Sequence, residues 1–242
     1  VQTDSISHQD YLDLRGLALF IETLINGRPF DELFSYAENF GITRTKVIQN
    51  LQENIQNASS KVKDLYQKFI AETQSELWDS EEELIAHYTE EKNYLRLKNG
   101  QVGGNLIYKY KSANLLLATS EWIEFIEKQV FQLVDNQTGF YIESGELKKQ
   151  LSNIAKFCNA KLEGLLDLKH VQHNATHTFD YDIIKWIDNP DSNLMDFKLH
   201  DKIEYTFGFS DEQIKVRKDQ LLRVGGDINS LSKIVTRISN LE

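Results

Sequence analysis

The sequence predicts a mainly α-helical protein, a multi-helix bundle with a small two-stranded antiparallel element near the C-terminus. Only two prolines, Pro29 and Pro190, interrupt the 242 residues, and so few helix breakers favour long helices. Apolar residues recur three or four positions apart through most of the chain before Lys169, which is typical of amphipathic helices. Beyond Lys169 the chain turns to short β-branched and aromatic runs, which favour strands.

Capping residues and glycines set the expected helix ends. Ser7 with Asp10 forms a capping pair for the first helix, and Ser80 with Glu83 forms a capping box for the fourth. Ser210 with Gln213 caps the helix that ends at Val224. The segment "NASS" at 57–60 is the weak point of the third helix, where it is expected to break or kink. With their caps, the expected helices cover residues 7–27, 29–41, 43–78, 80–100, 106–119, 120–134, 147–168, 210–224 and 227–241, with a turn at 136–139.

Two strands are expected at 174–182 and 202–210. In the second, apolar and polar positions alternate, which predicts a half-buried strand. Its apolar positions are Ile203, Tyr205, Phe207 and Phe209. A helical turn and the loop 188–193 join the two strands. The expected organisation is a helical body at 1–169 and a second part at 170–242, which holds the β element and a C-terminal helical hairpin and packs on the body as one module.

The composition argues against nucleic-acid and membrane partners. The formal charge is −10, and an acidic surface repels phosphate backbones. The most apolar stretch, 16–25, contains Glu22 and is too short to span a bilayer. The single cysteine, Cys158, excludes an intrachain disulfide and a cysteine-based zinc or iron–sulfur site within this chain. One free cysteine and no signal sequence predict a cytoplasmic protein.

The histidines of "KHVQHNATHTFDYDIIKW" are the first candidates for chemistry. On one helix face, His170, His173 and His177 could hold a metal ion, but the following residues favour an extended chain. In a strand, His173 and His177 share a face but lie roughly 13 Å apart, and His170 points to the other face. One ion cannot bind all three. We therefore favour histidines at the surface or at the edge of the core. A stand-alone metal-dependent enzyme built on these histidines remains an alternative hypothesis.

No other motif predicts catalytic residues. The acidic runs 79–83 and 90–91 are explained by the helix dipole and by a solvated helix face. The glycine pairs at 103–104 and 225–226 do not follow strands in a phosphate-binding pattern, and are interpreted as turns between helices. We therefore predict no catalytic, metal-binding or cofactor-binding residue.

The chain is rich in aromatic residues, most of which are expected in the core, while some could form a face that meets another domain. The aromatic residues considered are Tyr108, Tyr110, Trp122, Phe125, Phe131, Phe140, Tyr141, Phe179, Tyr181 and Trp186.

Two stretches, about a quarter of the chain, resemble a known family. "YLDLRGLALFIETLINGRPFDEL" is similar to a segment that follows the catalytic barrel in cobalamin-binding-domain radical SAM proteins. "FDYDIIKWIDNP…LMDFKL…KIEYTFGFSDEQ" resembles the end of the helical tail that this segment opens. The family implies a [4Fe–4S] cluster on a Cys-x-x-x-Cys-x-x-Cys loop, S-adenosylmethionine and cobalamin. This chain has one cysteine where three are needed, so the resemblance places no cofactor here.

The resemblance implies that the chain, which starts at Val1, is the C-terminal accessory module of such an enzyme. We expect it to pack on the radical SAM barrel of the same polypeptide and to help shape its substrate side, without catalysis of its own. The expected interdomain or substrate-side contacts are Phe179, Tyr181, Asp182 and Trp186. The alternative is an independent helical adaptor that binds a protein partner in a groove lined by Tyr, Trp and Phe.

Overall fold

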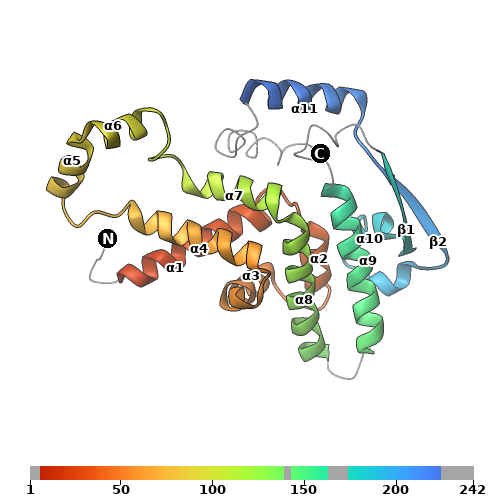
Figure 1. Ribbon diagram of the computed structural model, residues 1–242. Helices are drawn as coiled ribbons and strands as arrows, with labels where there is room; N and C mark the ends of the chain where they lie inside the picture. Colours follow the sequence, from red (N-terminus) through yellow and green to blue (C-terminus); the bar gives the residue numbers. More distant parts are fainter. Residues whose placement is uncertain (1–5, 139–142, 163–173, 225–242) are drawn as a thin grey trace.

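The computed structural model describes residues 6–138, 143–162 and 174–224, and Figure 1 shows their arrangement. Most of these residues are helical, and a two-stranded antiparallel sheet follows late in the chain, so the predicted fold class is confirmed. The α-helices are α1 (His8–Phe20), α2 (Asp31–Glu38), α3 (Arg44–Glu53), α4 (Ser60–Ser75), α5 (Glu81–Thr89), α6 (Glu91–Lys98), α7 (Leu106–Leu117), α8 (Thr119–Thr138), α9 (Ser144–Leu162), α10 (Ile183–Ile187) and α11 (Asp211–Val224). The strands are β1 (Ala175–Tyr181) and β2 (Lys198–Phe207). The short segments are the π-helix η1 (Ile21–Ile25) and the 3₁₀ turns η2 (Ile55–Asn57) and η3 (Leu194–Phe197).

The predicted helix starts are set by side-chain caps. The Ser7 hydroxyl accepts a hydrogen bond from the backbone N–H of Asp10, and the Asp10 carboxylate accepts one from the Ser7 N–H, which completes the capping box of α1. The Ser80 hydroxyl accepts from the backbone N–H of Glu83 at the start of α5. These bonds satisfy N–H groups that have no partner inside the helix.

One expected helix breaks at its predicted weak segment, a second breaks where no break was expected, and one expected turn is partly helical. The helix predicted over 43–78 breaks after α3, and Ser59 within the weak segment caps α4. The helix predicted over 80–100 breaks at Glu90, whose backbone is extended and separates α5 from α6. The expected turn at 136–139 is wrong for its first residues, because α8 continues to Thr138.

The core joins the helices and the hairpin. Helices α8 and α9 run side by side, α2 packs against both of them, and α3 packs against α8 (Figure 1). Their buried apolar side chains form one main cluster that also includes side chains of β1, α10 and η3. A second, smaller cluster joins α1, α4 and α7 at the other end, and its buried members are Leu19, Phe69, Leu106 and Tyr110. Both predicted parts of the chain therefore share the main cluster.

The two strands form an antiparallel hairpin with one apolar face. Ala175 pairs with Phe207 and Phe179 with Ile203, and an irregularity follows between Phe179 and Tyr181. The predicted alternation holds along β2, where every second residue from Ile203 to Phe207 is half-buried and packs against the main cluster. The strand begins at Lys198, four residues before the predicted start, and ends at Phe207, three residues before the predicted end at 210.

The predicted caps of α11 are present: the Ser210 hydroxyl accepts from the backbone N–H of Gln213, whose side chain accepts from the Ser210 N–H. The predicted helix at 227–241 and the end of the one at 147–168 lie outside the described residues. Phe140, Tyr141, His170 and His173 also lie outside them. Over the ranges that the structure covers, no helix combines the length and apolar character that crossing a bilayer requires.

Candidate functional site around the hairpin

The four residues predicted to contact another domain lie in the core of this chain. Phe179, Tyr181 and Trp186 are at most 1% exposed, and Asp182 is 5% exposed. A side chain with so little exposed surface offers almost nothing to a partner. All four therefore hold the chain's own elements together, and their contact with a second domain stays a prediction.

Trp186 of α10 connects the segment after β1 to the helical body. Its indole N–H donates to Oδ1 of Asn39 at 3.2 Å and to the backbone carbonyl of Ser192 at 3.1 Å. The Asn39 side chain in turn donates to the carbonyl of Pro190 at 2.6 Å. The ring of Tyr36 lies edge-on to the indole, with 6.3 Å between ring centroids. The predicted loop at 188–193 is thus anchored on the C-terminal end of α2.

Asp182 orders the corner between β1 and α10. One of its carboxylate oxygens accepts from the backbone N–H of Lys185, as a helix cap, and from the hydroxyl of Tyr205 at 2.6 Å. Burial raises the pKa of Asp182, but the hydrogen bonds from Tyr205 and Lys185 outweigh burial, and the pKa lies below its ordinary value. The carboxylate therefore stays ionised and occupied by its own chain, which is a structural role.

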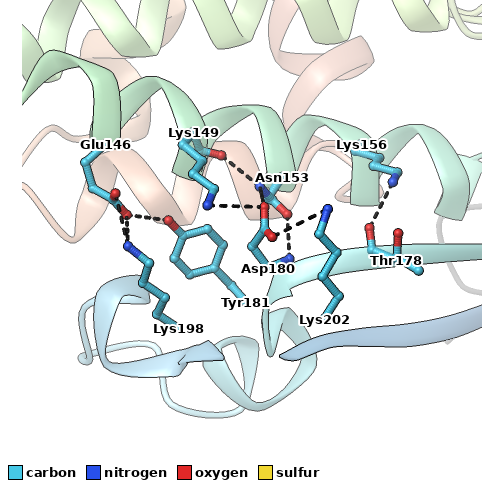
Figure 2. A network of polar contacts seen from close by, with 9 residues as sticks. All are labelled: Glu146, Lys149, Asn153, Lys156, Thr178, Asp180, Tyr181, Lys198 and Lys202. Atoms are coloured by element: carbon cyan, nitrogen blue, oxygen red, sulfur yellow. Dashed lines mark hydrogen bonds and ion pairs between the residues drawn. The ribbon is translucent and has the colours of Figure 1, made fainter. Parts of the chain in front are cut away.

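Side chains of α9 satisfy the outer edge of β1 (Figure 2). Asn153 accepts a hydrogen bond from the backbone N–H of Asp180 at 3.0 Å, and Lys156 donates to the backbone carbonyl of Thr178 at 2.9 Å. Unpaired edge groups would otherwise recruit another strand. The α9 side chains therefore make this part of β1 unsuitable for pairing with a partner strand.

Ion pairs continue the same contact between α9 and the hairpin (Figure 2). Glu146 accepts from the hydroxyl of Tyr181 and from Nζ of Lys198 at 3.2 Å. The hydrogen bond from Tyr181, together with Lys198, lowers the pKa of Glu146. Asp180 lies 3.6 Å from Nζ of Lys149 and is also paired with Lys202. Each carboxylate has cationic neighbours, so this network fastens the hairpin to α9.

The described residues contain no group of three or more His, Cys, Asp and Glu side chains that could hold a metal ion. Of the three histidines considered above, only His177 is described, and its ring packs edge-on against Phe207, 5.9 Å between centroids. The metal hypothesis therefore has no supporting geometry within these residues.

Cys158 is the chain's only thiol and is fully buried in α9. It donates a hydrogen bond to Glu32 at 3.3 Å, and Lys161 neutralises that carboxylate at 2.7 Å. Burial, together with the negative charge of Glu32, raises the pKa of Cys158 well above its ordinary value. The thiol is therefore a poor nucleophile, and Cys158 packs as a small buried side chain of the core.

The segment of α10 and η3 also exposes apolar residues that the sequence analysis did not predict. Ile184 and Ile187 of α10 are 45% and 41% exposed, and Met195 of η3 is 43% exposed. The helical spacing could have revealed them, because Ile183 and Trp186 share the buried face and Ile184 and Ile187 share the other.

The first two helical segments of the chain, α1 and η1, carry a similar pair of exposed apolar side chains. Leu14 of α1 is 53% exposed and Ile21 of η1 is 40% exposed. Seven residues apart, they lie on one side of the helix. Apolar side chains are thus exposed both near the start of the described chain and in the segment of α10 and η3.

No family model, no curated protein and no solved structure matches this chain.

Proposed function

We propose that the chain is the C-terminal helical module of a cobalamin-binding-domain radical SAM enzyme. In this proposal it packs on the catalytic barrel, helps to shape the substrate side and carries out no catalysis itself. The sequence resemblance suggests the enzyme class, and the exposed apolar residues of α10 and η3 support a packing role. A cytoplasmic location belongs to the same proposal.

The observation that carries the proposal is that the segment 179–197 has two sets of apolar side chains, one buried and one exposed. Its largest apolar side chains stabilise the chain's own core, while Ile184, Ile187 and Met195 remain more than two-fifths exposed. Burying the rest of such a side chain against a second domain contributes roughly 1 kcal/mol per residue. Three of them provide a useful part of an interdomain contact.

The cofactors of this class would be held elsewhere in the polypeptide. A [4Fe–4S] cluster of this type needs three thiolates, whereas this chain has one cysteine, which is buried and hydrogen-bonded to Glu32. S-adenosylmethionine and cobalamin would likewise belong to the barrel and to the domain before it. The contribution proposed for this chain is shape and contact surface.

The coding sequence upstream of Val1 is the first test. An in-frame Cys-x-x-x-Cys-x-x-Cys loop followed by this chain supports the proposal. A start codon directly before Val1 contradicts it and favours the independent adaptor.

The second test measures the contact itself. The preceding region and this chain are produced as separate polypeptides, and their binding is followed by isothermal titration calorimetry. We expect the double variant Ile184→Asp, Ile187→Asp to weaken binding at least about tenfold, because two charges would be buried without partners. The control is Leu117→Asp in α7, which is 48% exposed but lies outside both resembling segments. Equal effects of the two variants would contradict the assignment of this surface.

The alternative is an independent helical adaptor, and one observation favours it: α5 and α6 expose apolar side chains without burying any residue. The aromatic groove first expected for it would need other residues. Tyr110, Trp122 and Phe125 are buried, at 4% exposed or less. The upstream coding sequence distinguishes this alternative from the enzyme module.

A further inference from the structure

Helices α5 and α6 form an arm that projects from the α4 and α7 end of the body (Figure 1). Neither helix has a buried residue. The arm's exposed large apolar side chains are Leu84, Ile85, Tyr94, Leu95 and Leu97, each between 36% and 58% exposed. The rings of Trp78, His87 and Tyr88 contact one another at its base, so the arm is packed mainly on itself.

Such an arm is too small to be stable in isolation. The two helices have 9 and 8 residues, whereas isolated helices shorter than about 12 residues are marginal in water. Helices in proteins gain most of their stability by burying an apolar face against another element. The body does not provide that surface for the arm, which indicates that another surface does.

Charge identifies the surface that would fit. Helix α5 carries three glutamates, Glu81 to Glu83, and no Lys or Arg. Helix α6 carries Lys92, Arg96 and Lys98 against one glutamate. Within the part of the chain that the structure describes, no ion pair is formed by these six side chains. The acidic helix of one arm is therefore complementary to the basic helix of another.

We propose that the arm is a contact between two copies of this chain. In a two-fold symmetric dimer, α5 of each copy would pack antiparallel on α6 of the other, because the two contacts are equivalent by symmetry. The first turn of α5 would then meet the last turn of α6, and the apolar side chains would pack between them. Opposite helix dipoles would also be neighbours. This proposal does not depend on the proposed enzyme class.

The test is a charge exchange followed by analytical ultracentrifugation. The first variant, Glu81→Lys, Glu82→Lys, Glu83→Lys, makes the arm positive. The second, Arg96→Glu, Lys98→Glu, reverses the basic residues in the last turn of α6 and makes the arm negative. We expect the wild type to dimerise and each variant alone to dimerise at least about tenfold more weakly, because like charges would face each other. An equimolar mixture of the two variants should form a heterodimer of near wild-type affinity.

The mixture also separates repulsion from loss of folding, because an unfolded arm would not be rescued by its complement. The control variant reverses three exposed acids outside the arm, Glu53→Lys, Glu124→Lys and Asp188→Lys, and should dimerise as the wild type does. A monomeric wild type overturns the proposal and leaves the arm to a different partner. A mixture that stays monomeric also overturns it.

Discussion

The indole nitrogen of Trp186 lies 3.2 Å from Oδ1 of Asn39 and donates a hydrogen bond to it, across 147 residues of sequence. This bond joins α10, which follows the first strand, to the end of α2 in the helical body. Trp186 is 1% exposed and belongs to the main core cluster. The second part of the chain is therefore packed into the first at this point.

Trp186→Ala should lower the free energy of unfolding by about 3–5 kcal/mol, because it leaves a large cavity and removes two hydrogen bonds. Trp78→Ala, at a half-buried position beside the arm, is the control and should cost far less. Urea unfolding followed by circular dichroism measures both. Similar losses for the two variants would contradict the central role of Trp186.

The Gly16 position of α1 should not tolerate a methyl group. A Cβ atom there would lie 2.4 Å from the hydroxyl oxygen of Tyr66 on α4. Gly16→Ala should therefore destabilise the protein by about 1–3 kcal/mol through overpacking. Gly145→Ala in α9 meets no atom within 4 Å and should be neutral or slightly stabilising. Thermal unfolding of the two variants tests this contrast, which a stable Gly16→Ala protein would refute.

Removing one partner of the ion pair between Lys111 and Glu22 should destabilise the protein more than removing the other. Their charged atoms lie 2.8 Å apart, but the side chain of Lys111 is 3% exposed and that of Glu22 is 20% exposed. Glu22→Gln leaves the buried ammonium group of Lys111 without a counter-charge and should lower the free energy of unfolding by about 3–5 kcal/mol. Lys111→Met leaves a partly exposed carboxylate that still accepts a hydrogen bond from Asn26, and should cost less. Chemical denaturation should give this order, and the reverse order would contradict it.

Glu146 should make stability depend on pH in the acid range. Its pKa is lowered in the folded state by the hydrogen bond from Tyr181 and by Lys198. The stabilisation is therefore present above the ordinary value of 4.5 and is lost as the pH falls through the lowered folded-state pKa. Glu146→Gln should lower the unfolding free energy by about 1–2 kcal/mol at neutral pH.

The difference between wild type and Glu146→Gln should then shrink as the pH falls below 4.5, the ordinary value for this carboxyl. Glu53→Gln, which changes an exposed glutamate of α3, is the matched control and should leave the pH profile unchanged. Unfolding measured at a series of pH values gives both profiles. A constant difference between wild type and Glu146→Gln would exclude a role for ionised Glu146.

The helices were largely predictable, because local signals decide them. The caps at Ser7, Ser80 and Ser210 begin α1, α5 and α11, as the sequence indicated. The break at Glu90 was not predictable from periodicity, since the apolar positions on either side of it suit one continuous helix. Side-chain bonds from Asn93 to the His87 carbonyl and to Glu90 stabilise that corner.

The candidate contact residues were less predictable. Phe179, Tyr181 and Trp186 were singled out for their aromatic rings, which equally suit a core and an interface. Ile184 and Ile187 remain exposed in that segment. Isoleucine is usually a core residue, so the residue type gave no sign of their exposure. Only the packing of Trp186 on α2 shows which side of α10 is buried.

By itself, the sequence determined the mainly helical class, the antiparallel strands and most helix starts, because these depend on capping, periodicity and alternation between near neighbours. The tertiary structure alone decided which apolar faces are buried in the core and which remain exposed. That distinction depends on contacts between residues far apart in the chain, such as Trp186 with Asn39 and Asn153 with the backbone of Asp180. Local patterns contain no record of such contacts, and so the exposed surfaces of α10 and of the arm could be recognised only once the elements were assembled.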